Sequence, residues 1–149
     1  MKKTDLKHNL RIKKPKIDST VFIAKGAQVI GDIVLKPYSS IWYNSVLRAD
    51  INDIIIGSRS NIQDNCTLHL ENNKGILVGD DVTIGHNVIL HGCTIGDGAL
   101  IGMGSIIMNG VKIGRGATIG AGALIIDNTT IPDYCVAVGA PVRVIKKQT

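Results

Sequence analysis

A large aliphatic residue returns every sixth position through most of this chain, and this spacing restricts the possible folds more than any other feature. The series begins at Ile17, ends at Ile131 and changes register three times, once through a break at Glu71–Gly75. All nineteen sampled positions are Ile, Leu or Val although only 44% of the chain is hydrophobic, so chance does not explain the series. The positions are Ile17, Ile23, Val29, Leu35, Ile41, Leu47, Ile56, Ile62, Leu68, Val78, Ile84, Leu90, Ile95, Ile101, Ile107, Ile113, Ile119, Ile125 and Ile131.

A six-residue period matches neither a helix nor a simple alternating strand. Each repeat must return one aliphatic side chain to an interior, which a short strand and a turn achieve, and three repeats make one triangular coil. The sequence therefore predicts an all-β fold, a parallel β-helix of hexapeptide repeats with roughly six to seven coils. Gly often follows the aliphatic residue, as at Gly57, Gly79 and Gly102. We attribute these glycines to small size and a permissive backbone at a tight corner.

The repeat also sets the expected boundaries. The 149 residues are predicted to form one β-helix domain, with a basic lead-in at 1–16, hexapeptide repeats at 17–134 and a C-terminal strand and tail at 135–149. Because so few residues follow the repeats, a C-terminal helix is expected to be short or absent. The turn Gly139-Ala140-Pro141 suggests that the last strand leaves the axis of the coils.

The net charge of +5 is local, since residues 1–16 carry +6 and the rest of the chain −1. No aromatic interleaving or nucleic-acid motif accompanies these charges, so we expect a solvated segment and no nucleic-acid partner. No apolar run reaches membrane-helix length and the N-terminus lacks the apolar core of a secretory signal, which predicts no membrane contact and a cytoplasmic location. Cys66, Cys93 and Cys135 are accordingly expected to be reduced and buried.

Three histidines lie just past inward-facing aliphatic residues and are predicted to project outward near corners. His69 and His91 follow theirs by one place and His86 by two. His86 and His91 are five residues apart where the period is six, which places them on neighbouring faces of one coil. They are therefore not expected to bind one ion within a single chain, although two facing subunits would allow it. His8 lies outside the repeat, and no ligand role is expected for it.

The strings RADINDIIIGSRSNIQDNCTLH and VTIGHNVILHGCTIGDGALIGMGSII resemble the γ-class carbonic anhydrase-like proteins, over about residues 15–145. The restrictive motifs are NIQD, IGH, HGC and IGMG. The resemblance implies a left-handed β-helix, a homotrimer and three metal sites per trimer. It also implies that His69 and His91 of one subunit bind each metal together with His86 of the neighbour.

Three neutral imidazoles leave a tetrahedral zinc ion one open position, as in a catalytic site. Zinc lowers the pKa of its bound water to about 7, and Fe²⁺ or Co²⁺ accepts the same ligands. The predicted activity is therefore that of a carbonic anhydrase-like metalloenzyme, in which a metal hydroxide attacks carbon dioxide to give bicarbonate.

Polar residues near the histidines are further candidates. By resemblance, Gln63 would hydrogen-bond metal-bound water or bicarbonate, and Arg48 would form inter-subunit ion pairs with Asp50 and Asp64 at the border of the site. The residues alone support a purely trimer-holding role for the three charged groups equally well. Asn61, a further candidate near the substrate, could instead be a corner residue, because Asn tolerates unusual backbone angles.

Two acidic groups of well-characterised archaeal members of this family have no equivalent here. The residue after the Arg-x-Asp motif is Ile51, and the acidic loop after the first histidine is reduced to Glu71–Gly75, with Glu71 one place early. In those members the acidic residues shuttle protons. Since proton transfer often limits carbon dioxide hydration, the sequence predicts slow turnover.

Other functions remain open. An acyl-CoA thioesterase would use the same metal hydroxide on a thioester. A metal-free hexapeptide acyltransferase would share the solenoid and the Gly-x-Pro end motif and use one histidine as general base, but three histidines and NIQD argue against it. A non-catalytic scaffold that kept the site is a further alternative.

Overall fold

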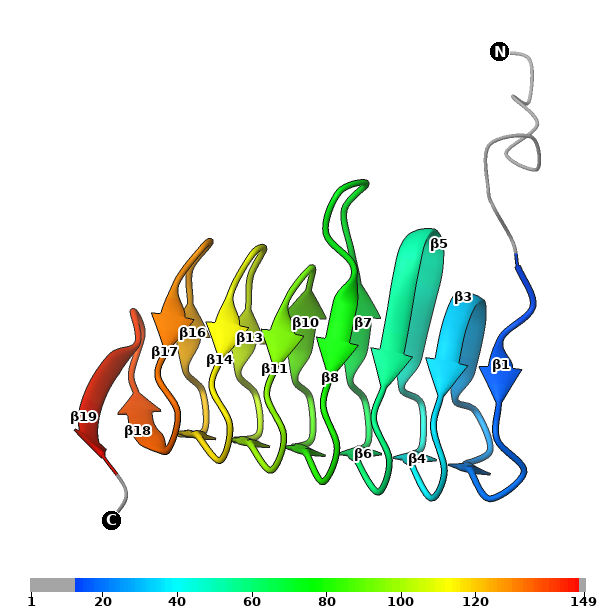
Figure 1. The fold of residues 1–149 in the computed structure, drawn as a ribbon, viewed down its shortest axis with the longest axis horizontal. Helices are drawn as coiled ribbons and strands as arrows, with labels where there is room; N and C mark the ends of the chain where they lie inside the picture. The colour runs from blue at the N-terminus through cyan, green and yellow to red at the C-terminus, as the bar shows by residue number, and fades with distance from the viewer. Residues whose placement is uncertain (1–12, 148–149) are drawn as a thin grey trace.

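The computed structural model describes residues 13–147 of the 149-residue chain. These residues form nineteen β-strands and no helix, wound into a solenoid of about seven turns (Figure 1). The architecture is the predicted all-β one and agrees with a left-handed parallel β-helix. Along residues 13–147 there is no helix long and apolar enough to span a membrane. His8 and most of the basic lead-in fall outside the described residues.

Each turn of the solenoid has three sides, and parallel strands stack along each of them. The first face consists of β3 (Gln28–Leu35), β5 (Val46–Ile56), β7 (Thr67–His69), β10 (Ile89–His91), β13 (Ile106–Ile107) and β16 (Leu124–Ile125). Strands β3 and β5 are long because they bend round a corner. Residues 46 and 47 of β5 pair with β7, whereas residues 54–56 pair with β8 on the second face.

The other two faces complete the triangle. The second face adds β1 (Lys16–Ile17), β8 (Ile76–Val78), β11 (Thr94–Ile95), β14 (Lys112–Ile113) and β17 (Thr130–Ile131) to the later halves of β3 and β5. The third face consists of β2 (Phe22–Ile23), β4 (Ser40–Ile41), β6 (Asn61–Ile62), β9 (Thr83–Ile84), β12 (Leu100–Ile101), β15 (Thr118–Ile119), β18 (Cys135–Val138) and β19 (Arg143–Lys147). Strand β19 turns back and pairs antiparallel with β18.

The aliphatic series fills the interior from Leu35 onward. Each member of the series from there to Ile131 is at most 2% exposed. Smaller residues two places earlier, such as Ser45, Cys66 and Ala99, are buried as well. Burial of one large aliphatic side chain contributes about 2 kcal/mol. The stacked aliphatic residues are therefore the main source of stability.

The first coil departs from the prediction. Ile17 is 45% exposed and Ile23 is 37% exposed, while Val29 is only partly buried. These residues stack on the following coil, but no described residue covers their other side. The expectation that all nineteen aliphatic residues are enclosed is therefore wrong at this end of the solenoid.

Of the two causes expected for the glycines that follow the aliphatic residues, small size is confirmed and the permissive backbone is wrong. Gly57 and Gly102 do not have positive φ, so the corner does not require a permissive backbone there. A Cβ on Gly57 would lie 2.1 Å from the carbonyl oxygen of Gly79 in the next coil, so close stacking excludes a side chain. Positive φ occurs instead three places after the aliphatic residue, where Asn or Gly is common. Examples are Asn44, Asn65, Asn87, Gly98 and Gly104.

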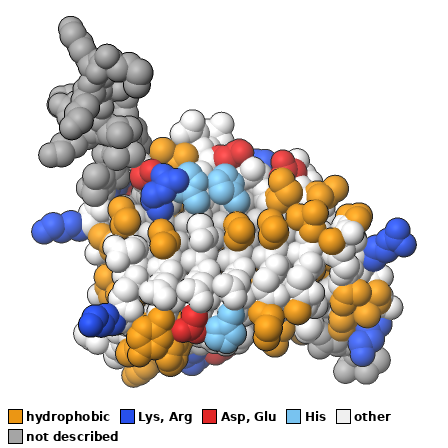
Figure 2. All heavy atoms as spheres, turned by 180° about the vertical axis from the view of Figure 1, so that it is seen from behind, with side chains coloured by type: hydrophobic (Ala, Val, Ile, Leu, Met, Phe, Trp, Pro, Cys, Tyr) orange, Lys and Arg blue, Asp and Glu red, His pale blue; other side chains and the backbone are white. Residues whose placement is uncertain are grey.

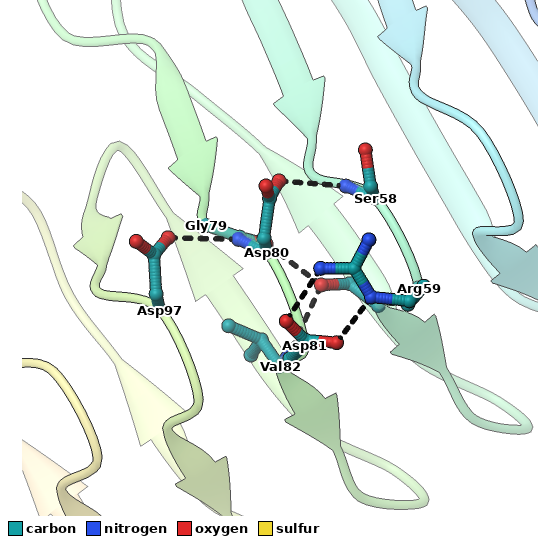
Figure 3. Close-up of polar contacts among 8 residues, drawn as sticks. Ser58, Arg59, Gly79, Asp80, Asp81, Val82 and Asp97 are labelled. Carbon is teal, nitrogen blue, oxygen red and sulfur yellow. Dashed lines mark hydrogen bonds and ion pairs between the residues drawn. The ribbon is translucent and has the colours of Figure 1, made fainter.

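Aspartates join successive coils at the corner between the second and third faces (Figure 3). Asp80 accepts a hydrogen bond from the backbone N–H of Ser58 at 2.8 Å, and Asp97 accepts one from that of Asp80 at 2.8 Å. Arg59 donates Nε and Nη2 to the carboxylate of Asp81 at 2.6 and 2.7 Å, which lowers the pKa of that carboxyl. An exposed ion pair of this kind contributes little to stability. This corner is structural, and the polar groups of chemical interest lie at the other two.

Candidate metal centre

His69 and His91 meet at the corner between the first and second faces. Strands β7 and β10 are neighbours, and their register pairs His69 with His91. The preceding leucines point inward, so both imidazoles point outward from the same corner. His69 Nδ1 and His91 Nε2 lie 3.2 Å apart, and both side chains are half-buried.

Arg48 and Asp50, on β5, adjoin this pair. Asp50 Oδ1 lies 3.0 Å from His69 Nε2, and the Arg48 guanidinium donates to Asp50 Oδ2. Burial alone raises the pKa of Asp50, but the hydrogen bonds from His69, from the backbone and from Arg48 outweigh it and lower that pKa. An ionised carboxylate can only accept, so His69 carries its proton on Nε2. The lone pair of His69 is then on Nδ1 and faces His91.

A further polar side chain at this corner, Asn109, was not predicted. Its Oδ1 lies 2.6 Å from His91 Nδ1, and its Nδ2 donates to Glu71 Oε1 at 2.8 Å. Asn109 follows β13, one coil beyond His91. The pairing of Leu90 with Ile107 is the sequence signal that would have found it, since Asn109 comes two places after that aliphatic residue.

His86 lies at a different corner, between the third and first faces. Its Nδ1 is 3.0 Å from Asp64 Oδ2. The pocket around it is lined by Ser40, Trp42, Arg59, Asn61, Gln63, Asp64 and His86. Figure 2 shows histidine side chains at two separate edges of one face of the molecule. His86 is therefore separated from His91 within the chain, as their five-residue spacing predicts.

Two amides in the His86 pocket have unused hydrogen-bonding capacity. Asn61 is a residue of strand β6 and does not have positive φ, so its interpretation as a corner residue is wrong. Its Nδ2 donates to Thr83 Oγ1 at 3.2 Å, while its Oδ1 is buried without a partner among the described residues. The Gln63 side chain likewise has no hydrogen bond within the described part of the chain. Buried polar groups normally have partners, so the Asn61 oxygen is expected to receive a hydrogen bond from outside the described residues.

The histidine pair fits a metal ion, although the described residues of one chain do not supply a third ligand. Within residues 13–147, no group of three or more His, Cys, Asp or Glu side chains could hold a metal. Two imidazole nitrogens on one tetrahedral zinc ion are separated by ~3.3 Å, given zinc–nitrogen bonds of ~2.0–2.1 Å. The observed 3.2 Å matches this value. A metal ion bound by this pair would therefore need further ligands from outside the described residues.

The cysteines are unsuited to nucleophilic chemistry. Cys66, Cys93 and Cys135 are all free and buried. Burial raises the pKa of Cys93 to about 12 and that of Cys66 to about 11, so both are thiols at neutral pH. Cys93 lies close to His91 in sequence, but it is a packing residue, as predicted.

Comparisons with known proteins agree with this arrangement. The family model of the bacterial transferase hexapeptide (six repeats) matches residues 75–107 and 92–127. Gamma carbonic anhydrase 2, mitochondrial, of Arabidopsis thaliana is 44% identical over 147 residues, covering 95% of this chain and 53% of that protein. A probable carbonic anhydrase of Methanocaldococcus jannaschii is 50% identical over 133 residues, covering 89% of this chain and 84% of the relative. The chain belongs to the γ-class carbonic anhydrase-like family.

This γ-class carbonic anhydrase-like chain covers different shares of its relatives. It spans about half the length of the plant relative but most of the archaeal one. A solved structure of an acetyltransferase candidate from Bacillus cereus is also similar, with a TM-score of 0.91 and 50% identity over 92% of this chain and 80% of that one. Proteins this similar thus carry names of two different reactions, and the site residues have to distinguish between them.

Proposed function

We propose that this chain is a metal-dependent carbonic anhydrase that hydrates carbon dioxide to bicarbonate at a site between two subunits. The observation that carries the proposal is the facing pair of nitrogens, His69 Nδ1 and His91 Nε2, 3.2 Å apart. An acyltransferase that uses one histidine as a base has no need of such a pair. The names of the archaeal and plant relatives support the same reaction.

His69 and His91 of one subunit and His86 of the next would hold the metal. Three neutral imidazoles suit Zn²⁺, and Fe²⁺ or Co²⁺ accepts the same donors. When bound, such an ion acidifies a coordinated water, so that a nucleophile is available near neutral pH. The chain's own residues orient the ligands and bind the substrate.

A cyclic trimer would bring these half-sites together. The first face of the solenoid has His69 and His91 at one edge and His86 at the other, and hydrophobic side chains form a row along it (Figure 2). Ile89 and Ile106, neighbours in this row, are 42% and 40% exposed. Packing this face against a second copy would bury the row and bring opposite edges together.

The polar residues take separate roles in this proposal. Asp50 holds the proton on His69 Nε2, and Arg48 keeps Asp50 ionised. Gln63 donates from its free amide to an oxygen of bicarbonate, and the orphan Oδ1 of Asn61 accepts a hydrogen bond in the same pocket. Asp64 orients His86 and, together with Arg48, contributes to ion pairs across the subunit boundary.

Proton release is the weak step of this site. Ile51, the residue beside Asp50, is 38% exposed at the position where an acidic shuttle would be needed. Protons must therefore leave directly to buffer or through water. We expect turnover to be slow in dilute buffer and to rise with buffer concentration. Three free, buried thiols are in keeping with a reducing cytoplasm as the location.

The test begins with elemental analysis of protein purified without added metal, followed by stopped-flow carbon dioxide hydration with and without a chelator. We expect about one metal ion per subunit and hydration that the chelator abolishes. Thr94→Ala, an exposed change on the second face and away from the proposed subunit contact, is the control for His91→Ala. Bound metal without hydration above buffer would sink the proposal, and acyl-CoA hydrolysis in the same samples would replace it with a thioesterase. Metal-free protein that binds CoA would restore the acyltransferase.

A further inference from the structure

His91 is held from behind by a chain of two hydrogen bonds. Asn109 Oδ1 lies 2.6 Å from His91 Nδ1, and Asn109 Nδ2 lies 2.8 Å from Glu71 Oε1. Asn109 is 18 residues from His91 and 38 from Glu71, so three different coils or loops converge here. None of these contacts touches the opposite corner, where His86 lies.

The chemistry of the end groups fixes the direction of both hydrogen bonds. An ionised carboxylate can only accept, so the amide NH₂ of Asn109 must face Glu71. The amide oxygen of Asn109 then faces His91. Because that oxygen can also only accept, His91 must carry its proton on Nδ1. The remaining lone pair of neutral His91 is on Nε2, which is the atom that faces His69.

The result mirrors the arrangement on the other side of the pair. Asp50 holds the proton of His69 on Nε2, which leaves a lone pair on Nδ1. Two acceptor nitrogens therefore face each other across 3.2 Å. Such an arrangement is stabilised only by a cation or a proton between them. With Asp50 alone, His91 could carry its proton on Nε2 and donate a hydrogen bond to His69 Nδ1. Asn109 and Glu71 prevent this, so the gap between the two nitrogens favours a positive charge.

The position of Glu71 is itself built into the fold. Glu71 and Lys74 exchange backbone hydrogen bonds of 3.2 Å in both directions, which closes the loop into a tight turn. Asn52 donates from its side chain to the carbonyl oxygens of Glu71 and Asn72 at 3.3 and 3.0 Å. On the far side, Lys74 Nζ donates to Asn128 Oδ1 at 3.2 Å. The loop that interrupts the six-residue repeat is therefore tied to coils on both sides.

The backbone of Asn109 is held as well. Its N–H donates to Asp127 Oδ1 at 3.0 Å. We infer that Glu71 and Asn109 form a positioning relay that fixes the tautomer and orientation of His91, and that the loop Glu71–Gly75 serves to deliver the Glu71 carboxylate. The inference deepens the proposed function, because the metal role of His91 rests on it. The relay itself is a property of the metal-free chain.

The first experiment measures the tautomer of His91 in metal-free protein by ¹⁵N NMR of histidine-labelled samples, at a pH well above the ordinary histidine pKa of about 6.5. Wild type should show the proton on Nδ1. Asn109→Ala and Glu71→Ala should show mixed or reversed tautomers. Glu71→Gln, which keeps an acceptor oxygen, should remain close to wild type. Asn73→Ala, an exposed change in the same loop, is the control and should be unchanged. A wild-type tautomer in Glu71→Ala would overturn the relay.

The second experiment measures Co²⁺ and Zn²⁺ affinity by competition with a chelator. Loss of a group that orients a metal ligand costs ~10–100-fold in affinity, and we expect Asn109→Ala in that range and Glu71→Ala near its lower end. Because both act along one path, the double variant should bind no more weakly than Asn109→Ala alone. Additive losses would contradict the relay.

Two outcomes distinguish the relay from a proton-transfer role of Glu71 and from failure of the proposed function. If Glu71→Ala lowers only buffer-dependent turnover and changes neither tautomer nor affinity, Glu71 transfers protons and the relay is wrong. If wild type binds neither metal, the proposed function fails, and the NMR result alone decides the relay. Circular dichroism of each variant verifies that the solenoid is intact.

Discussion

The corner that carries His69 and His91 and the corner that carries His86 are built from the same repeat, yet they are equipped differently. At the first, both histidines are held from behind, by Asp50 and by Asn109. At the second, His86 contacts Asp64, while the amide oxygen of Asn61 lacks a partner among the described residues. In the proposed shared site, the first corner would be the finished half and the second the open half, which a second copy would complete.

Insertions explain the difference. The second corner keeps the strict six-residue count, so only the residues just after the aliphatic one reach outward. The first corner is interrupted by the long bend of β5 and by the loop Glu71–Gly75, which extend beyond the regular turns (Figure 1). The extra residues place Asp50 and Glu71 behind the histidines. The breaks in the repeat therefore occur at the corner where polar side chains support the histidine pair.

The largest expected effects come from removing a ligand at either corner. His91→Ala and His86→Ala should each lower metal affinity by more than ~100-fold, beyond the cost of losing a group that merely orients a ligand. If the two corners complete one another, co-expressed His91→Ala and His86→Ala chains should regain metal and activity in mixed oligomers. In those oligomers, one subunit interface joins His69 and His91 of the His86→Ala chain to His86 of the His91→Ala chain.

The same chains mixed after separate purification, without subunit exchange, serve as the control for that experiment. Full metal affinity in His86→Ala would show that the first corner binds metal alone. The comparison between a finished and an open half would then be wrong.

A somewhat smaller effect is expected from separating the subunits. Ile106→Glu places a charge in the hydrophobic row of the first face and should yield monomers, because an unpaired charge is costly to bury. Metal affinity should fall by roughly 100-fold while the circular dichroism stays that of a β-solenoid. Leu100→Glu, at 44% exposure on the third face, is the matched control. Sedimentation gives the oligomeric state, and a tightly metallated monomer would refute the shared site.

Much of the fold, and part of the site, could be predicted from the sequence. The aliphatic period predicts the coils because each repeat must bury one side chain, and it fails at Ile17, where no described coil covers the end. The histidine spacing predicts two separate corners because phase within a coil is a local property. The phase of the repeat places Asn109 one coil beyond His91, but its contact with Glu71 could not be predicted, since that contact depends on how an insertion folds back over later coils.

Adding an acidic group at the corner of His69 and His91 tests whether the site lacks a proton shuttle. Ile51→Glu places a carboxylate beside Asp50 at a position that is 38% exposed. It should raise turnover in dilute buffer several-fold, because an added general acid–base group shortens proton transfer, and leave metal affinity within about twofold. Ile51→Gln controls for size and polarity. Stopped-flow hydration at several buffer concentrations measures the effect, and equal turnover in both variants would mean that proton release is not limiting.

The smallest effect concerns the thiols behind the two corners. Burial raises the pKa of Cys93 to about 12 and that of Cys66 to about 11, against an ordinary value of 9.0. A raised folded-state pKa favours the neutral thiol, so the stability it contributes is fully present below pH 9 and is lost as the pH rises through 11. At pH 8 the thiolate fraction of each is at least ~100-fold below that of an unfolded cysteine, and labelling should require opening of the coils. Single-cysteine chains, labelled beside a urea-unfolded control, measure this. Faster labelling of Cys66 than of Cys93 would show that the open corner also unfolds locally, and equal rates would confine the difference between the corners to their polar side chains.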